Sequence, residues 1–178
     1  MKKVQVQLHR SLKENLVDLP NDCDWGCKRN SKGKKESWRG FKFHLDGADG
    51  DVPVSPLLTS TSVFDNQAAV PLAQMSSERV TNLYDLMDAA YDTREINIFS
   101  KKLGHVPLID HNPRRGEKVE MGPAEKRRYH ERSSAERVFS NLENYGSKTV
   151  RVRGAKKVMC HLMFGGVGNF DGFSNRKI

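Results

Sequence analysis

The chain has 178 residues, a formal net charge of +8 and 37% hydrophobic residues. This length and composition suit one domain of ordinary size with its own core. The sequence has no apolar run long enough to span a membrane and no signal-peptide segment, so it indicates a cytoplasmic protein. The positive charge favours a polyanionic partner, which means nucleic acid or an acidic membrane surface.

The first forty residues combine a helical pattern with a polar stretch. Apolar residues recur at every fourth position from Val4 to Leu16, which predicts an amphipathic helix over residues 4–17. Residues 18–40 are polar and rich in turn-forming residues, so the sequence predicts an N-terminal helix and basic linker over residues 1–37.

A basic segment lies within residues 26–42, where seven Lys or Arg residues face a single Glu. Such a segment is either a solvated loop or a surface for the phosphate backbone of DNA. Trp25 and Trp38 flank it and could stack on bases, and the pattern alone leaves both interpretations open.

Three cysteines are too few for a disulfide framework. Cys23 and Cys27 lie four positions apart, with His44 further along the chain, which gives at most half of a zinc site. Ordinary reduced thiols are the favoured interpretation, and a structural zinc module is a third hypothesis for function.

Alternating strands and helices are predicted along the middle of the chain. Residues 38–46 alternate as a half-buried strand, and residues 52–63 form its hairpin partner, with prolines that suggest a sheet edge. A helix follows with Asp65 or Asn66 as its N-cap. Then come a short strand that ends at a loop within residues 83–92, a helix over 93–104 capped by Asp92 or Thr93, and a strand over 105–110.

The longest helical pattern covers residues 123–145, after a polar loop over 111–122. Its predicted buried face consists of Ala135, Val138, Phe139 and Leu142. A final apolar helix is expected over 158–164, followed by a disordered tail over residues 165–178. The order of elements indicates an α/β fold with one mixed sheet.

Acidic residues at two places suggest a chemical site. Asp88 lies at the end of a predicted strand, and Tyr129, Arg132, Glu136 and Glu143 share one face of the long helix. Converging carboxylates can hold a pair of divalent ions that flank a scissile phosphate, and an arginine can bind that phosphate. The alternatives are a strand-end acid, a solvated helix face and, for Asp92, a helix cap; Asp85 receives no role.

Several ordered blocks resemble one family. "WRGFKFHLD" with "VPVSPLLTSTSVFDNQAAVPL", "LYDLMDAAYDTREI", "LGHVPLIDHNPRRGEK" and "RYHERSSAERVFSNLENYG" resemble segments of bacterial insertion-sequence DDE transposases of the insertion-sequence-four-like group. The resemblance covers about residues 18–165 and includes a Y–2–R–3–E–6–K signature.

The resemblance implies an RNase H-like fold over residues 38–164 and Mg²⁺- or Mn²⁺-dependent cleavage and transfer of transposon ends. Carried over by position, Asp88 and Glu136 match catalytic, metal-binding carboxylates, and Tyr129 and Arg132 match the supporting signature. The expected partner is DNA with transposon terminal repeats, a homodimer is considered, and the protein would associate with the bacterial nucleoid. The candidate DNA-binding residues are Lys28, Arg29, Lys32, Lys34, Lys35, Arg39, Arg151, Arg153, Lys156 and Lys157.

Two departures from the family stand out. No segment matches the family's first strand and its aspartate, and Glu143 occupies the position of the signature lysine. We therefore expect an N-terminally truncated transposase without its first strand, which is inactive because a two-metal site lacks one of its three ligands. The alternative is a DNA-binding fragment without catalytic activity.

Overall fold

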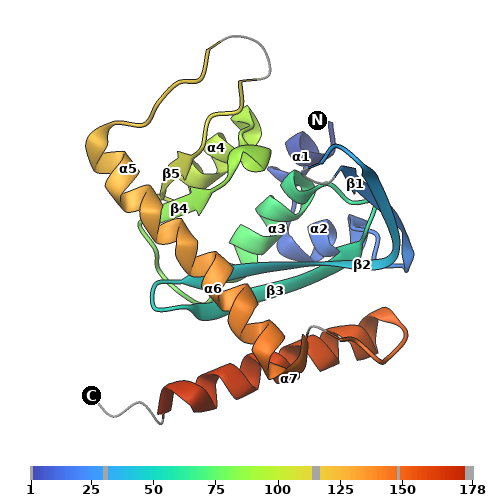
Figure 1. The fold of residues 1–178 in the computed structure, drawn as a ribbon. Coiled ribbons are helices and arrows are strands. Elements are labelled where there is room, and N and C mark those ends of the chain that lie inside the picture. Colours follow the sequence, from blue (N-terminus) through green and yellow to red (C-terminus); the bar gives the residue numbers. More distant parts are fainter. Residues whose placement is uncertain (1, 30–31, 114–116, 148, 175–178) are drawn as a thin grey trace. The chain divides into compact units, whose positions relative to one another are not determined.

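The structure is a computed structural model that describes residues 2–29, 32–113, 117–147 and 149–174. The chain folds into two compact units (Figure 1). The first unit consists of Met1–Leu19 and Phe64–Ser133, and the second unit consists of Pro20–Val63 and Ser134–Ile178.

The first unit is a set of helices around a small parallel sheet. Its core is formed by Val4, Ala69, Val70, Ile96 and Phe99. Its elements are α1 (Lys2–Gln7), α2 (Leu12–Asp18), α3 (Asp65–Ser77), β4 (Tyr84–Met87), η1 (Ala89–Tyr91), α4 (Arg94–Lys102), β5 (Val106–Ile109), α5 (Pro123–Tyr129) and η2 (His130–Arg132).

The strand–helix–strand arrangement over β4, α4 and β5 is confirmed. The two strands are parallel, and Met87 is the partner of Ile109 at their C-terminal ends. Thr93 is the N-cap of α4, and its hydroxyl accepts a hydrogen bond from the Ile96 amide. Gly104 follows the helix with φ of 84°, a conformation that glycine adopts without steric cost.

The prediction of one helix over residues 4–17 is wrong, because the chain forms α1 and α2 separately. Ser11 caps α2 through a capping box with Glu14: the Ser11 hydroxyl accepts from the Glu14 amide, and the Glu14 carboxylate accepts from the Ser11 amide. Two otherwise unpaired backbone donors are satisfied in this way, so a new helix begins at this point.

The predicted helix is confirmed as α3, which ends at Ser77, but its N-cap is Phe64 rather than Asp65 or Asn66. Pro71 lies inside the helix, where it lacks the amide that would bond to the Gln67 carbonyl. The buried Gln7 side chain donates to that carbonyl over 2.8 Å. A contact from α1 therefore compensates for the proline.

The second unit contains a three-stranded antiparallel sheet in the order β1 (Asp24–Arg29), β2 (Lys35–Ala48) and β3 (Val52–Ser60). The predicted hairpin and its proline-containing edge strand are confirmed. The basic segment, however, is not a loop, because β1 pairs with the first part of β2. The predicted boundary between residues 37 and 38 therefore falls inside a strand.

Two helices pack in the second unit beside the sheet. They are α6 (Ser133–Leu142), followed by a π-helical turn η3 (Glu143–Ser147), and α7 (Ala155–Ser174). Leu58 of β3 packs with Val158 and Leu162 of α7. The helix α7 continues to Ser174, so the prediction of disorder from residue 165 is wrong up to that residue; extending a formed helix costs little per residue. Residues 175–178 lie outside the described residues.

The predicted single mixed sheet is wrong for the described residues, whose strands form two sheets, one antiparallel and one parallel. The general α/β class is confirmed. The finer RNase H-like assignment stays a prediction. Among the described residues, no helix combines the length and apolar character needed to cross a membrane.

Candidate active site

Asp88 lies directly after β4, at the strand end where the sequence predicts it. Its Oδ1 accepts a hydrogen bond of 2.9 Å from the Ala90 amide, which makes Asp88 the N-cap of η1. The residue is exposed. An exposed carboxylate at the carboxyl end of a strand is available for a ligand, and its hard oxygen atoms suit Mg²⁺ or Mn²⁺.

Asp110 is a second acid at the same strand edge, and the sequence analysis missed it. It follows β5 directly, and its amide donates to the Met87 carbonyl over 3.2 Å. Its carboxylate pairs with Lys118 Nζ at 2.9 Å. The sequence does contain a pattern that could have identified Asp110. "HVPLID" is a predicted strand that ends in this aspartate, and the carboxyl ends of parallel strands lie at the same edge of a sheet.

Tyr129 is held against this edge. Its hydroxyl donates to the Met87 carbonyl over 3.1 Å, one residue before Asp88. Burial raises the pKa of Tyr129 above its ordinary value; the Arg132 guanidinium acts in the opposite direction, while the carboxylates of Asp110 and Asp88 raise it further. The phenol therefore stays protonated near neutral pH and acts as a hydrogen-bond donor.

Arg132 belongs to the same group of side chains. Its guanidinium carbon lies 5.8 Å from the centre of the Tyr129 ring, which is within cation–π range. The first unit therefore brings together three of the site residues that the family resemblance predicts: Asp88, Tyr129 and Arg132.

Asp92 has a structural role, although Thr93 rather than Asp92 is the N-cap of α4. It is the C-cap residue of η1, and its Oδ2 accepts from the Asn112 amide over 2.9 Å. The Asn112 side chain donates in turn to the Ala89 carbonyl over 3.1 Å. These bonds fix the turn after β4 to the segment after β5.

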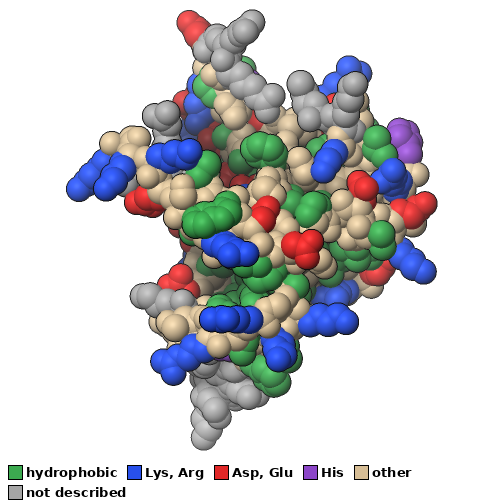
Figure 2. All heavy atoms as spheres, turned by 90° about the vertical axis from the view of Figure 1, so that its right-hand side faces the viewer, with side chains coloured by type: hydrophobic (Ala, Val, Ile, Leu, Met, Phe, Trp, Pro, Cys, Tyr) green, Lys and Arg blue, Asp and Glu red, His purple; other side chains and the backbone are tan. Residues whose placement is uncertain are grey.

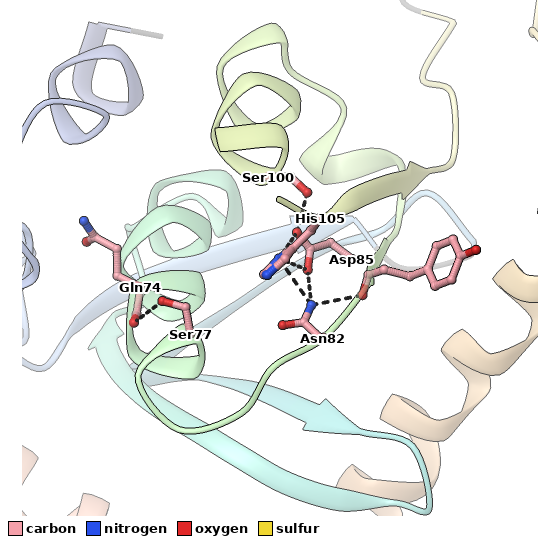
Figure 3. A network of polar contacts seen from close by, with 7 residues as sticks. Gln74, Ser77, Asn82, Asp85, Ser100 and His105 are labelled. Atoms are coloured by element: carbon pink, nitrogen blue, oxygen red, sulfur yellow. Dashed lines mark hydrogen bonds and ion pairs between the residues drawn. The ribbon is translucent and has the colours of Figure 1, made fainter. Parts of the chain in front are cut away.

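Asp85, which received no role from the sequence, is the acceptor of a polar network (Figure 3). Its carboxylate accepts from the Ser100 hydroxyl, from Asn82 Nδ2 at 2.7 Å and from His105 Nδ1 at 3.1 Å. The side chains of His105 and Asp85 are only 9% and 11% exposed. The network joins α4 to both strands of the parallel sheet.

Serine, histidine and aspartate in this network do not form a nucleophilic triad. In such a triad the histidine accepts the serine proton, and the carboxylate orients the histidine. Here the Ser100 hydroxyl and His105 both face the Asp85 carboxylate, so the serine proton is donated to the acid. The arrangement is a structural tie.

Glu136 is exposed in the first turn of α6, in the second unit. Its helix is tied to the β2–β3 turn by Asp51, whose carboxylate accepts from Arg137 Nε at 2.9 Å and from Ser134 Oγ at 2.8 Å. Asp51 has φ of 65°, a left-handed conformation that costs about 1 kcal/mol or more outside glycine. The carboxylate bonds offset that strain.

The predicted long helix is not one regular α-helix. Residues 123–147 form α5, the 3₁₀ turn η2, α6 and η3 in succession. Tyr129 and Arg132 belong to the first unit, and Glu136 and Glu143 belong to the second unit. Of the predicted buried face, Val138 and Leu142 are buried, while Phe139 is partly exposed and packs edge-on with Phe43.

The candidate DNA-binding side chains that the structure describes are exposed. Lys32 and Lys34 lie in the β1–β2 turn region, and Lys35 and Arg39 lie on β2. Arg151, Arg153, Lys156 and Lys157 lie just before α7 or in its first turn. The side chains of Lys28 and Arg29 lie outside the described residues. Figure 2 shows lysine and arginine side chains that project from the surface, with exposed hydrophobic side chains between them.

Among the described residues, no group of three or more histidine, cysteine, aspartate or glutamate side chains is arranged to hold a metal ion. His44 is buried and bonded to the Thr59 hydroxyl at 2.9 Å, and Cys23 and Cys27 are exposed free thiols. The zinc hypothesis therefore gains no support from the placement of these residues. The carboxylates of Asp88 and Glu136 have suitable chemistry for Mg²⁺, and they belong to different units.

Comparison with known families adds one match. The family model described as "Transposase DDE domain" matches residues 9–165. No curated protein and no solved structure matches the chain. The matched range contains Asp88, Tyr129, Arg132 and Glu136.

The first prediction separates the two acids of β4. Asp85→Ala removes the acceptor of the buried Ser100 hydroxyl and of the partly buried Asn82 and His105 side chains, so it should lower the free energy of unfolding by about 2–4 kcal/mol. Asp88→Ala removes one cap at an exposed site and should cost about 1 kcal/mol or less. Urea denaturation of both variants measures the difference, and equal effects would contradict the assignment of Asp85 to structure.

The second prediction concerns Tyr129 at high pH. Because its pKa is raised in the folded state, the unfolded chain loses the proton first, and the stability is lost as pH rises from about 10 through the raised folded pKa. Tyr129→Phe should remove this part of the alkaline destabilisation. Denaturation at pH 8 and pH 11 measures it, with Tyr84→Phe on β4 as control; an unchanged pH dependence in Tyr129→Phe would refute the prediction.

The third prediction tests the tie between Asp51 and α6. Asp51→Ala removes two hydrogen bonds and leaves a non-glycine residue at positive φ, so it should destabilise the second unit by about 1–3 kcal/mol. Asp51→Asn keeps an acceptor and should cost less. Hydrogen exchange of the α6 amides gives the readout, and exchange in Asp51→Ala as slow as in the wild type would argue against Asp51 as the group that holds α6.

Proposed function

Because this chain belongs to the family of transposase DDE domains, we propose that it is a transposase domain in which Asp88 and Glu136 correspond to metal-binding carboxylates for strand cleavage and transfer at insertion-sequence ends, and that residues 1–178 by themselves bind DNA without cleaving it. The observation that carries this proposal is the exposed Asp88 at the carboxyl end of β4, beside Tyr129 and Arg132.

The residues of the first unit have distinct roles in this proposal. Asp88 offers an exposed carboxylate, and the Ala90 amide and the Tyr129 bond to Met87 hold the strand end that carries it. Asp88 would hold Mg²⁺ or Mn²⁺, an ion that would supply activation of the attacking oxygen and stabilisation of the leaving oxygen of the phosphate. Arg132 supplies a positive charge that suits a phosphate oxygen of the DNA strand.

Asp110 is added to the site by its position. Its carboxylate follows β5 at the same edge as Asp88, and Lys118 neutralises it. The hydrogen bond and the charge of Asp110 raise the pKa of Lys118, which keeps this lysine protonated. The strand edge therefore carries an ion pair at Asp110, and this carboxylate is already paired with Lys118.

Glu136 supplies the second carboxylate from α6, where the Asp51 tie fixes the first turn of the helix. Glu143, in place of the signature lysine, lowers the positive charge that DNA would meet beside it. None of the residues assigned here fills the position of the family's first aspartate. Residues 1–178 alone should therefore bind DNA without cleaving it, which is also the alternative function of a DNA-binding fragment.

DNA binding in this proposal rests on the exposed basic side chains of β2, of the β1–β2 turn region and of the start of α7. Such contacts release counterions, so the affinity should fall steeply with salt. The same contacts favour any polyanionic strand, and the sequence of the ends recognised is a separate property.

The fourth prediction tests binding and cleavage together. The purified chain should shift a labelled transposon-end duplex in a gel, and raising salt from 50 to 200 mM should weaken binding by roughly a hundredfold or more if several phosphates are contacted. With Mg²⁺ or Mn²⁺ present, no nicking is expected. Metal-dependent nicking that Asp88→Ala abolishes would overturn the expectation of an inactive chain and would support a complete site.

A further inference from the structure

The β1–β2 hairpin separates the two tryptophans of the chain onto opposite faces. Trp25 is paired with Arg39 and Gly26 is paired with Trp38 across the strands. Neighbouring residues of a strand point to opposite faces, and paired residues point to the same face. Trp25 and Trp38 therefore cannot act together, although both flank the basic segment.

Trp38 belongs to the packed face. Gly26 is buried beneath it, and a Cβ on Gly26 would lie 3.0 Å from the Trp38 ring and 2.8 Å from the Thr61 Cβ. Glycine is required here because the indole ring and Thr61 fill the space above the strand. This contact explains Trp38 without any ligand.

Trp25 lies on the other face and is 68% exposed. Its cross-strand partner Arg39 is exposed, and Lys35 lies on the same face of β2 four residues earlier. Cys27 and Ser37, which form the pair between them, are small and exposed. A large flat ring therefore stands beside two cations on an open strand face.

Asp24, which is next to Trp25 in the sequence, does not neutralise this face. Asp24 precedes Trp25, but its carboxylate accepts hydrogen bonds from the Ser62 amide and the Thr61 hydroxyl, on the packed side. These bonds, first from Ser62 and then from Thr61, lower the pKa of Asp24. The Asp24 carboxylate is therefore bonded to the residues that follow β3, and the cations on the Trp25 face are Lys35 and Arg39.

We propose that this outer face, formed by Trp25, Lys35 and Arg39, binds a DNA strand by stacking Trp25 on an unpaired base while the two cations contact the flanking phosphates. The proposal rests on the DNA-binding role proposed above and adds the mode of contact. Charge complementarity selects a polyanionic strand as the occupant, and an exposed indole favours a partner with free π-faces. A paired base in a duplex keeps its faces covered by stacking, so an unpaired base fits better.

The experiment compares a single-stranded oligonucleotide, a duplex with one unpaired thymine and a fully paired duplex, all by fluorescence anisotropy at fixed salt. Trp25→Ala should weaken binding of the first two about 5- to 150-fold, and Trp25→Phe should keep most of the affinity. Binding of the fully paired duplex should change little. Phe64→Ala, at another exposed aromatic residue, is the matched control and should have no effect.

Two further measurements sharpen the test. In a Trp38→Phe chain, the remaining indole fluorescence should be quenched by the single strand, and Arg39→Gln should lower the single-strand salt slope by about 0.7. Equal affinities of wild type and Trp25→Ala, or an equal loss on the fully paired duplex, would overturn the stacking proposal while DNA binding stands. Absence of binding to all three DNAs would overturn both this inference and the proposed DNA-binding role.

Discussion

The Asp85 carboxylate is the interaction on which the arrangement of the candidate site depends in the first unit. It receives hydrogen bonds from Ser100 on α4, from His105 at the start of the β5 segment and from Asn82 before β4. Three segments separated in sequence are thereby held in one register. That register places Asp88 and Asp110 at the same edge of the parallel sheet. The Tyr129 hydroxyl donates a hydrogen bond to the Met87 carbonyl at this edge.

Two acids three residues apart on this segment have opposite roles for a physical reason. Asp85 is nearly buried, and a buried carboxylate is tolerated only when donors surround it. Asp88 is exposed and accepts one amide, so its carboxylate can be shared with a ligand. The buried carboxylate of Asp85 and the exposed carboxylate of Asp88 thus differ in the number of hydrogen-bond donors around each.

The second unit repeats this division of labour. Asp51 accepts bonds from Ser134 and Arg137 and fixes the first turn of α6, while Glu136 between them is exposed. The hairpin does the same with its aromatic residues, since Trp38 covers Gly26 and Trp25 stands open to solvent. In both units, one residue of each pair is used for packing or for holding neighbouring segments together, and its counterpart is exposed.

The sequence by itself determined the local elements: the strand before Asp88, the helix α4 with its cap at Asp92 or Thr93, and the hairpin turn all follow from short-range periodicity and capping. It also determined the family, because the ordered blocks are recognised from residue types and their spacing alone. Only the tertiary structure decided that the basic segment pairs as β1 with β2 and that a 3₁₀ turn separates α5 from α6. It also decided that the carboxylates of Asp85 and Asp51 hold neighbouring segments together by hydrogen bonds. Those outcomes depend on partners many residues away in the chain, and a local pattern carries no information about which distant donor will meet a given carboxylate.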